Sequence, residues 1–264
     1  MSRRRDLERI ELALRETATV LSSFFRSDLK VERKEGGDPV TEADRAANEV
    51  LMRLLPSDGD GWLSEETVDD PARLRARRVW IVDPLDGTRE FVTGIPEWSV
   101  SIGLVEDGVP VAGGICNPAT GQTVLGAPGH GVTLNGMPVT TAPRAALDGA
   151  HVLASRSEVK RGEWERFREA PFRVEACGSV AFKLARVAAG LADATWTLVP
   201  KHEWDVAAGV ALVLAAGGKV WLPTGGAPSF NRPSPKLPGL IATSAALADA
   251  ASEFLAAEAG AARS

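Results

Sequence analysis

The sequence predicts an α+β or α/β protein in which layers of helix and sheet alternate. The first part of the chain alternates apolar with small or polar residues, as antiparallel strands do, and the second part alternates short strands with helices. With 264 residues, 44% of them hydrophobic, the chain suffices for one large domain or two closely joined halves. We expect an α+β half over residues 1–145 and an α/β half over 146–264. Residues 140–149 form the linking loop, and the two halves make one compact unit.

The first half opens with helical patterns. Apolar residues recur every three or four positions between Leu7 and Phe25, which predicts a long amphipathic helix. A second helix is expected to begin at Thr41, after Gly36-Gly37-Asp38-Pro39, and to end before Pro56. Strands are expected at 62–64 and 79–82, with hairpins over 98–116 and around Asn135-Gly136.

Strands and helices alternate in the second half. Helices are expected over 158–168 and 179–189, and a very apolar helix over 205–216 is closed by Gly217-Gly218. Short strands are expected at 151–154, 194–198 and 240–243, followed by an alanine-rich last helix.

Composition argues against several classes of protein. A net charge of −5 with seven lysines leaves no basic stripe, so a nucleic acid polymer is not an expected partner. No window approaches 18 uninterrupted apolar residues, so we expect no membrane association. The only cysteines, Cys116 and Cys177, do not make a disulfide framework, and a reducing cytoplasm is the expected location.

Two aspartates three positions apart follow an apolar strand, in Val82-Asp83-Pro84-Leu85-Asp86-Gly87-Thr88. Pro84 is expected to end the strand, Gly87 allows a tight turn, and Thr88 begins a short helix whose N-terminus attracts an anion. Two close carboxylates need a cation, and oxygen ligands suit a hard ion such as Mg²⁺. An Asp-Pro turn followed by a helix cap is the structural alternative. If the two carboxylates bind a cation, the motif predicts metal-dependent phosphate chemistry.

Further acidic residues have settings that allow them to join this pair. Glu65 and Glu66 follow the strand at 62–64, Asp44 lies three residues after Thr41, and Asp205 begins an apolar helix. Each has a structural alternative, since Glu-Glu pairs are usually solvated and both aspartates occupy positions typical of helix caps. The ordered combination, rather than any single residue, indicates a site.

This combination resembles the inositol-monophosphatase-like family of magnesium-dependent, lithium-sensitive phosphatases over nearly the whole chain. The segments that carry the resemblance are Asp38-Pro39-Val40-Thr41-Glu42-Ala43-Asp44, Ser64-Glu65-Glu66, Trp80-Ile81-Val82-Asp83-Pro84-Leu85-Asp86-Gly87-Thr88 and Trp204-Asp205-Val206-Ala207-Ala208-Gly209. Ser64 replaces a glycine usual in the family, while the carboxylates are kept. The resemblance implies a layered αβαβα sandwich of the inositol monophosphatase and fructose-1,6-bisphosphatase type, as a monomer or homodimer.

The resemblance also implies a role for each residue. Two or three Mg²⁺ ions would be bound by Glu65, Asp83, Asp86, Asp205 and the Leu85 carbonyl. Asp44, Thr88 and Glu65 would form the catalytic set, in which Thr88 and Asp44 orient a metal-bound water and Glu66 helps to position a ligand water or a second ion. The N–H groups of Gly87 and Thr88 would hold the phosphate. The expected enzyme is a metal-dependent phosphoric monoester hydrolase that needs no phosphoenzyme.

The substrate is a small phosphorylated metabolite whose identity stays open. Inositol monophosphatases proper carry an acidic residue seven positions before the last metal-binding aspartate, where this chain has Leu198. Residues 83–91 and Ser155-Arg156-Ser157 look more like the 3′(2′),5′-bisphosphate nucleotidase branch, which converts 3′-phosphoadenosine 5′-phosphate to AMP and phosphate.

Candidate contacts to a second phosphate or ribose are Ser179, Lys183 and Lys201. Asp205 is a further candidate substrate contact. Their structural alternatives are solvated lysines and a helix-capping serine. An inositol-1-monophosphatase, another sugar phosphatase acting on histidinol phosphate or fructose bisphosphate, and a non-catalytic binder of a phosphorylated metabolite are the alternatives. The binder is disfavoured because every metal ligand is present.

Overall fold

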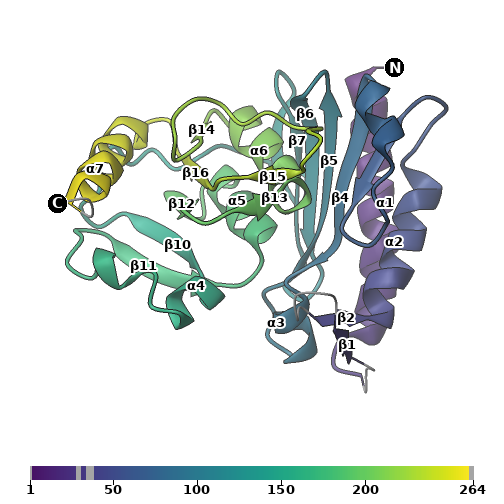
Figure 1. The fold of residues 1–264 in the computed structure, drawn as a ribbon, viewed down its shortest axis with the longest axis horizontal. Coiled ribbons are helices and arrows are strands. Elements are labelled where there is room, and N and C mark those ends of the chain that lie inside the picture. Colours follow the sequence, from purple (N-terminus) through teal and green to yellow (C-terminus); the bar gives the residue numbers. More distant parts are fainter. Residues whose placement is uncertain (1, 28–30, 34–38, 262–264) are drawn as a thin grey trace.

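The computed structural model describes residues 2–27, 31–33 and 39–261, so Gly36, Gly37 and Asp38, which precede the expected second helix, lie outside the described residues. Helix and sheet layers alternate in the order αβαβα (Figure 1), as the resemblance implied. Helices α1 (Arg3–Phe24) and α2 (Glu42–Leu54) form the first layer, and α5 (Val180–Ala188) and α6 (Glu203–Ala215) lie between the two sheets. Helix α7 (Ala248–Ala261) covers the outer face of the second sheet.

Within the described residues, the first sheet has seven strands in the order β3-β4-β5-β6-β7-β8-β9. Strand β3 is parallel to β4, and every following neighbour is antiparallel. Both predicted hairpins are present, and the turn at Asn135-Gly136 has the positive φ angles, 50° and 79°, of a type I′ turn. The strands are β3 (Gly61–Ser64), β4 (Arg78–Asp86), β5 (Ser99–Glu106), β6 (Val109–Asn117), β7 (Gln122–Ala127), β8 (Gly131–Leu134) and β9 (Met137–Val139).

The second sheet has five strands among the described segments, in the order β11-β10-β12-β16-β14. Its core strand β10 is parallel to both β11 and β12. The strands are β10 (His151–Ser155), β11 (Arg173–Cys177), β12 (Ala194–Thr197), β14 (Lys219–Trp221) and β16 (Leu240–Thr243). Two small antiparallel pairs join β1 (Val31–Arg33) to β2 (Pro39–Thr41) and β13 (Lys201–His202) to β15 (Lys236–Leu237).

Two local predictions are wrong. The helix expected over 158–168 is divided into α4 (Arg156–Lys160) and a 3₁₀ turn (Glu165–Phe167), because Gly162 between them adopts a φ of +77° that a helix cannot contain. Strand β4 does not end at Pro84 but continues to Asp86, with a shift of register against β5 between Asp83 and Asp86. Such a bulge accommodates a proline, which has no N–H to donate to the sheet. Helix α3 (Thr88–Val92) follows directly, as expected.

Helix α6 packs against the first sheet at backbone distance. A Cβ atom added at Gly113 of β6 would lie 2.4 Å from the Ala208 carbonyl oxygen, and one added at Gly103 of β5 would lie 2.9 Å from the Ala208 nitrogen. Glycine at these two positions therefore lets the helix backbone meet the sheet directly.

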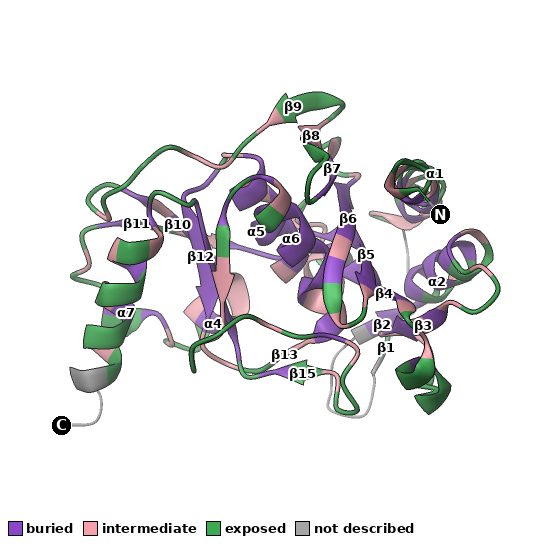
Figure 2. Ribbon diagram, turned by 90° about the horizontal axis from the view of Figure 1, so that it is seen from above, coloured by how far each residue is buried: buried purple, intermediate pink, exposed green. Residues whose placement is uncertain are grey.

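The largest apolar core joins the two expected halves of the chain. It contains Leu63, Val79 and Ile81 from the first sheet together with Leu184 of α5 and Leu212 of α6. Buried residues gather on α6 and on the strands that face it (Figure 2). Within the described ranges, every helix is too short or too polar to cross a membrane.

Candidate active site

A polar cleft of about 360 Å³ lies where β4 ends against the first turns of α5 and α6. All the predicted metal ligands and substrate contacts line it: Glu65, Asp83, Leu85, Asp86, Gly87, Thr88, Ser179, Lys183, Lys201 and Asp205. Other lining residues, without a predicted role, are Arg89, Glu90, Arg161, Gly178, Val180 and His202. The cleft is also lined by Ser155 and Ser157 of the segment Ser155-Arg156-Ser157. The fold thus brings residues 140 positions apart to one place.

Three elements carry the acidic side of the cleft. Glu65 follows β3, and its N–H group lies 3.4 Å from the Val82 carbonyl of β4. Asp83 and Asp86 lie on either side of the β4 bulge and pair with Ser101 and Ser99 of β5, so the sheet fixes both. Gly87 connects the strand to α3 with a φ of +95°, where a Cβ atom would lie 3.0 Å from the Glu97 carbonyl. The bulge therefore aims two carboxylates into one cleft.

The Asp83 carboxyl is buried, with the residue 2% exposed, and its Oδ1 accepts a hydrogen bond of 3.0 Å from the Leu85 N–H. Burial raises the pKa of Asp83 well above its ordinary value, and the charges of Glu65, Asp86 and Asp205 raise it further. This carboxylate therefore lacks enough positive charge among its protein neighbours.

One oxygen of Asp86 is committed to the first turn of α5. Its Oδ2 accepts hydrogen bonds from the Ser179 hydroxyl at 2.7 Å and from the Ala181 N–H at 2.6 Å. Burial raises the pKa of Asp86, although these two hydrogen bonds oppose the effect. The other oxygen, Oδ1, is left to serve the cleft. Ser179 also accepts from the Phe182 N–H at 2.9 Å, so the predicted helix cap is present together with the contact to Asp86.

Asp205 caps α6 and faces the cleft at the same time. It accepts a hydrogen bond of 2.9 Å from the His202 N–H. Desolvation raises the pKa of Asp205 well above its ordinary value, and Asp86 and Glu65 add to the shift. The structural alternative for Asp205 is therefore correct without excluding a role in the cleft.

The donor set fits a hard divalent cation. Its ligands are all oxygens, and their carboxylates repel one another in the absence of a cation, which is the environment that Mg²⁺ occupies in proteins. No three His, Cys, Asp or Glu side chains of the described residues already close around a single point. The fit therefore rests on donor chemistry and on the raised pKa values rather than on a preformed coordination shell.

Asp44 lies behind the cleft and reaches it through Thr88. The buried carboxylate accepts from both the N–H and the hydroxyl of Thr41 at 2.7 Å, which completes the predicted capping box of α2. Its Oδ1 lies 3.1 Å from the Thr88 hydroxyl, which is equally close to the Leu85 carbonyl oxygen. A hydroxyl has one hydrogen to donate, so Thr88 serves one of these acceptors at a time.

Two lysines extend the wall of the cleft beyond the carboxylates. Lys183 is 3% exposed, and its Nζ donates to the Ser179 carbonyl at 3.1 Å. No carboxylate of the described residues lies within ion-pair distance of Lys183, and burial lowers its pKa. Lys201 forms an ion pair of 3.0 Å with the buried Glu158. The alternative of a freely solvated lysine is therefore wrong for Lys183.

Sequence reasoning missed an ion pair beside the cleft. Arg156 binds Glu97 through two nitrogens at 2.7 and 3.0 Å, and Glu97 also accepts from the Gly178 N–H at 2.6 Å. The ion pair ties the loop after α3 to the start of α4, and the Gly178 hydrogen bond ties the same loop to the residues before α5. Nothing local in the sequence indicates it, because its two members are 59 positions apart.

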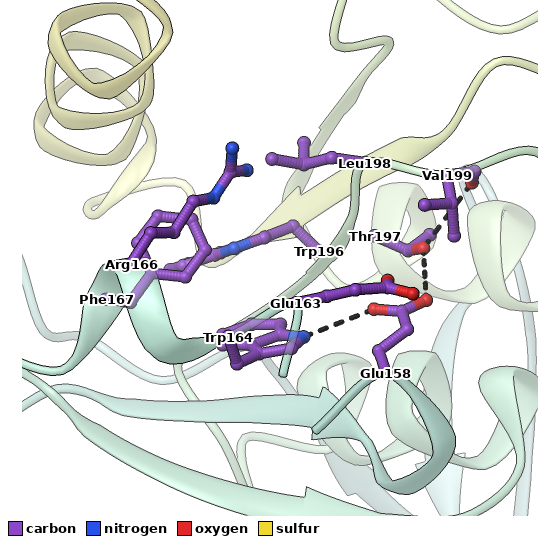
Figure 3. Close-up of a pocket in the computed structure, with 9 residues that line it drawn as sticks. All are labelled: Glu158, Glu163, Trp164, Arg166, Phe167, Trp196, Thr197, Leu198 and Val199. Atoms are coloured by element: carbon purple, nitrogen blue, oxygen red, sulfur yellow. Dashed lines mark hydrogen bonds between the residues drawn. The ribbon is translucent and has the colours of Figure 1, made fainter. Parts of the chain in front are cut away.

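Leu198 lies outside the residues that line this cleft. It lines a neighbouring pocket together with Trp164, Phe167 and Trp196 (Figure 3). The resemblance expects an acidic residue at this position, in contact with sugar hydroxyls. This chain has an apolar side chain there, in a pocket that also contains Glu158, Glu163 and Arg166.

Known proteins similar to this chain belong to one family. A model of the inositol monophosphatase family matches residues 4–262. Inositol monophosphatase 3 of Solanum lycopersicum is 33% identical over 226 residues, covering 81% of this chain and 84% of that protein. The solved IMPase of Thermotoga maritima superposes with a TM-score of 0.80 at 29% identity, over 98% of this chain and 99% of that one. CysQ from Bacteroides thetaiotaomicron, a bacterial member of the inositol monophosphatase family, gives 0.75 at 29% identity, over 90% and 97%.

Proposed function

The chain belongs to the inositol monophosphatase family, whose members are phosphatases, and from that premise we propose that it is a 3′(2′),5′-bisphosphate nucleotidase. The enzyme would use magnesium and hydrolyse 3′-phosphoadenosine 5′-phosphate to AMP and phosphate. The observation that supports this substrate is the pair Lys183 and Lys201. Both lysines line the same cleft as the acidic cluster, which consists of Glu65, Asp83, Asp86 and Asp205.

Five residues would hold the cations. Glu65, Asp83, Asp205 and the Leu85 carbonyl supply oxygens to the cleft, and Asp86 supplies the oxygen that α5 does not occupy. Mg²⁺ bound there neutralises phosphate charge and lowers the pKa of a coordinated water. The first N–H groups of α3, at Gly87 and Thr88, have no acceptor within the helix and line the cleft, so they can hold phosphate oxygens.

Thr88 and Asp44 would orient the attacking water. When Thr88 donates its hydrogen to Asp44, the lone pairs of its oxygen can accept a hydrogen bond from water in the cleft. Asp44 is held by both hydrogen bonds from Thr41 and cannot turn away. The pair therefore fixes the direction in which Thr88 accepts, which orients the water for in-line attack.

A second anionic group on the substrate would balance the charge of the buried Lys183. Lys183 is a buried cation without a carboxylate within ion-pair distance among the described residues, and burying such a charge is unfavourable unless a counter-charge arrives. A bisphosphate supplies that charge, whereas a monophosphate held by the metal site does not.

An inositol or sugar phosphatase is the second candidate. The relative from Solanum lycopersicum is named as an inositol monophosphatase, which favours a cyclic polyol as substrate. Leu198 argues against it, because an apolar side chain cannot accept hydrogen bonds from polyol hydroxyls.

Phosphate release from 3′-phosphoadenosine 5′-phosphate and from inositol 1-phosphate, each with Mg²⁺ and with EDTA, tests the proposal. Histidinol phosphate and fructose 1,6-bisphosphate complete the panel. We expect magnesium-dependent turnover with a clear preference for the nucleotide. A preference for inositol phosphate would favour the second candidate. A chain that binds but hydrolyses none of these esters would be a non-catalytic binder.

Replacing Lys183 with methionine should lower kcat/KM for the nucleotide bisphosphate by about 10- to 100-fold, the value of one hydrogen bond to a charged group. The effect on inositol 1-phosphate should be much smaller, because that substrate has no second phosphate. Lys219→Met is the matched control, since Lys219 is an exposed lysine of β14. Equal losses on both substrates would contradict a contact to the second phosphate.

Millimolar Li⁺ is expected to inhibit turnover, because the resemblance implies a cation site of the lithium-sensitive type. The measurement is the rate of phosphate release at fixed Mg²⁺ with LiCl, and KCl at the same ionic strength is the control. Equal rates in both salts would contradict this expectation.

A further inference from the structure

We propose that the pocket lined by Leu198 and three aromatic side chains binds the base of the nucleotide substrate. This inference rests on the proposed function and names the part of the cleft that would select a nucleotide. The pocket has a volume of about 300 Å³, at the small end of the range for ligand sites (Figure 3). We call it the aromatic pocket, and its walls include Trp164, Phe167, Trp196, Leu198, Glu163 and Arg166.

Two ion pairs form the boundary between the phosphate cleft and the aromatic pocket. Lys201 lines the cleft and lies 3.0 Å from Glu158, which lines the pocket. Arg161 lines the cleft and lies 2.6 Å from Glu163, which lines the pocket. The cations therefore face the phosphates and the carboxylates face the aromatic pocket. One substrate with an anionic part and an aromatic part would fit that division of charge.

The walls of the aromatic pocket are held in place. The buried Glu158 accepts from the Trp164 Nε1 at 3.2 Å and from the Thr197 hydroxyl at 2.6 Å, and both bonds are visible in Figure 3. Trp164 stacks on Trp196 with ring centroids 5.3 Å apart and an angle of 19° between the planes. Phe167 meets Trp196 edge to face at 5.7 Å. The pocket is thus preformed and does not have to assemble around its occupant.

The chemistry of the lining favours a planar ring with a polar edge. The three aromatic residues are only 2–7% exposed, and Trp164 and Trp196 stack on each other, so the rings offer edges to an occupant, which suit edge-to-face contacts. The Arg166 guanidinium lies over the Phe167 ring, 4.7 Å from its centroid, and adds a planar cationic group to the lining. The Glu163 carboxylate can accept from the exocyclic amine of adenine.

The test compares two substrates that differ only in the base: 3′-phosphoadenosine 5′-phosphate and the methyl glycoside of ribose 3,5-bisphosphate. In the Leu198→Trp variant, whose larger side chain fills the aromatic pocket, we expect the preference for the nucleotide to fall about tenfold or more, mainly through KM. An edge-to-face aromatic contact together with the apolar area that it buries has about that value. Arg166→Ala, at an exposed side chain, should lower the preference in the same direction. Arg168→Ala, two positions away and also exposed, is the control and should keep it.

A binding measurement without turnover separates the two proposals. Saturation-transfer NMR with adenosine in EDTA reports contact of the base alone, with no phosphate and no metal. Contact with the wild-type protein that is lost in Leu198→Trp supports the aromatic pocket even if the chain prefers inositol phosphate. An unchanged substrate preference in both variants, or adenosine contact that survives Leu198→Trp, would overturn the pocket and leave the nucleotidase proposal standing.

Discussion

Replacing Asp83 with asparagine is expected to lower kcat by about 10³-fold or more, the range for losing charge neutralisation in phosphoryl transfer. Asp83 lies at the centre of the acidic cluster, and the charges of Glu65, Asp86 and Asp205 all act on it. Asparagine has nearly the same shape but cannot supply the negative charge that a cation requires. Phosphate release at saturating Mg²⁺ and calorimetric titration with Mg²⁺ measure the two effects.

The same substitution should stabilise the metal-free protein at neutral pH. Because the folded-state pKa of Asp83 lies well above the ordinary aspartate value of 3.8, the folded state holds a proton that the unfolded state releases. The contribution of Asp83 to stability in EDTA is therefore fully present below pH 3.8 and is lost as the pH rises through the raised pKa. Asparagine removes this carboxylate, so the thermal midpoint of the variant should fall less over that range.

Asp107→Asn is the matched control for both measurements. Asp107 is an exposed turn residue with a φ of 50°, a conformation that asparagine also tolerates. Neither kcat nor the affinity for Mg²⁺ should change. Full activity of Asp83→Asn would refute its assignment as a metal ligand, and loss of activity with loss of folding would assign it a structural role instead.

Replacing Thr88 with alanine should lower kcat by about 10²-fold or more, as expected for a group that orients the attacking water. The hydroxyl is the link between the cleft and the buried Asp44, 3.1 Å away, and alanine removes that link without changing the charge of the site. Since Thr88 is not expected to bind metal, the affinity for Mg²⁺ should be retained. Steady-state kinetics with Mg²⁺ titration distinguishes the two effects.

Two further variants make the Thr88 result specific. Thr88→Ser keeps the hydroxyl and should recover much of the lost kcat. Thr93→Ala removes an exposed hydroxyl at the other end of α3, which donates to the Arg89 carbonyl at 2.9 Å, and should leave kcat unchanged. A change in KM alone in Thr88→Ala would contradict the role in orienting water.

The candidate site could be predicted because its chemistry is concentrated in short segments. Asp83, Asp86 and Thr88 lie within six consecutive residues, and Asp205 stands at the start of an unmistakably apolar helix. The layered fold followed from the change in hydrophobic pattern near residue 140. Patterns of this kind predict local structure only. That Asp205 lies in the same site as Asp83 was predicted from the family resemblance alone.

The features that were missed depend on contacts between distant segments. The apolar spacing of Trp164 and Phe167 suits a helix, but Gly162 and the packing of both rings on Trp196 produce turns instead. The edge strand β11 carries Arg173 and Glu175, whose charges hide it from a hydrophobic pattern. The burial of Lys183 depends on how α5 meets the second sheet, which no local pattern reveals.

The close contact between α6 and the first sheet has a consequence for the chain as a whole. Residues 1–145 alone would expose the sheet face that α6 covers, and residues 146–264 alone would expose the helices that cover it. Cleavage within 140–149 should therefore give two fragments that aggregate separately and recover magnesium-dependent activity only when refolded together. Catalysis by this chain would then be a property of an association between two pieces that the linker keeps at high local concentration.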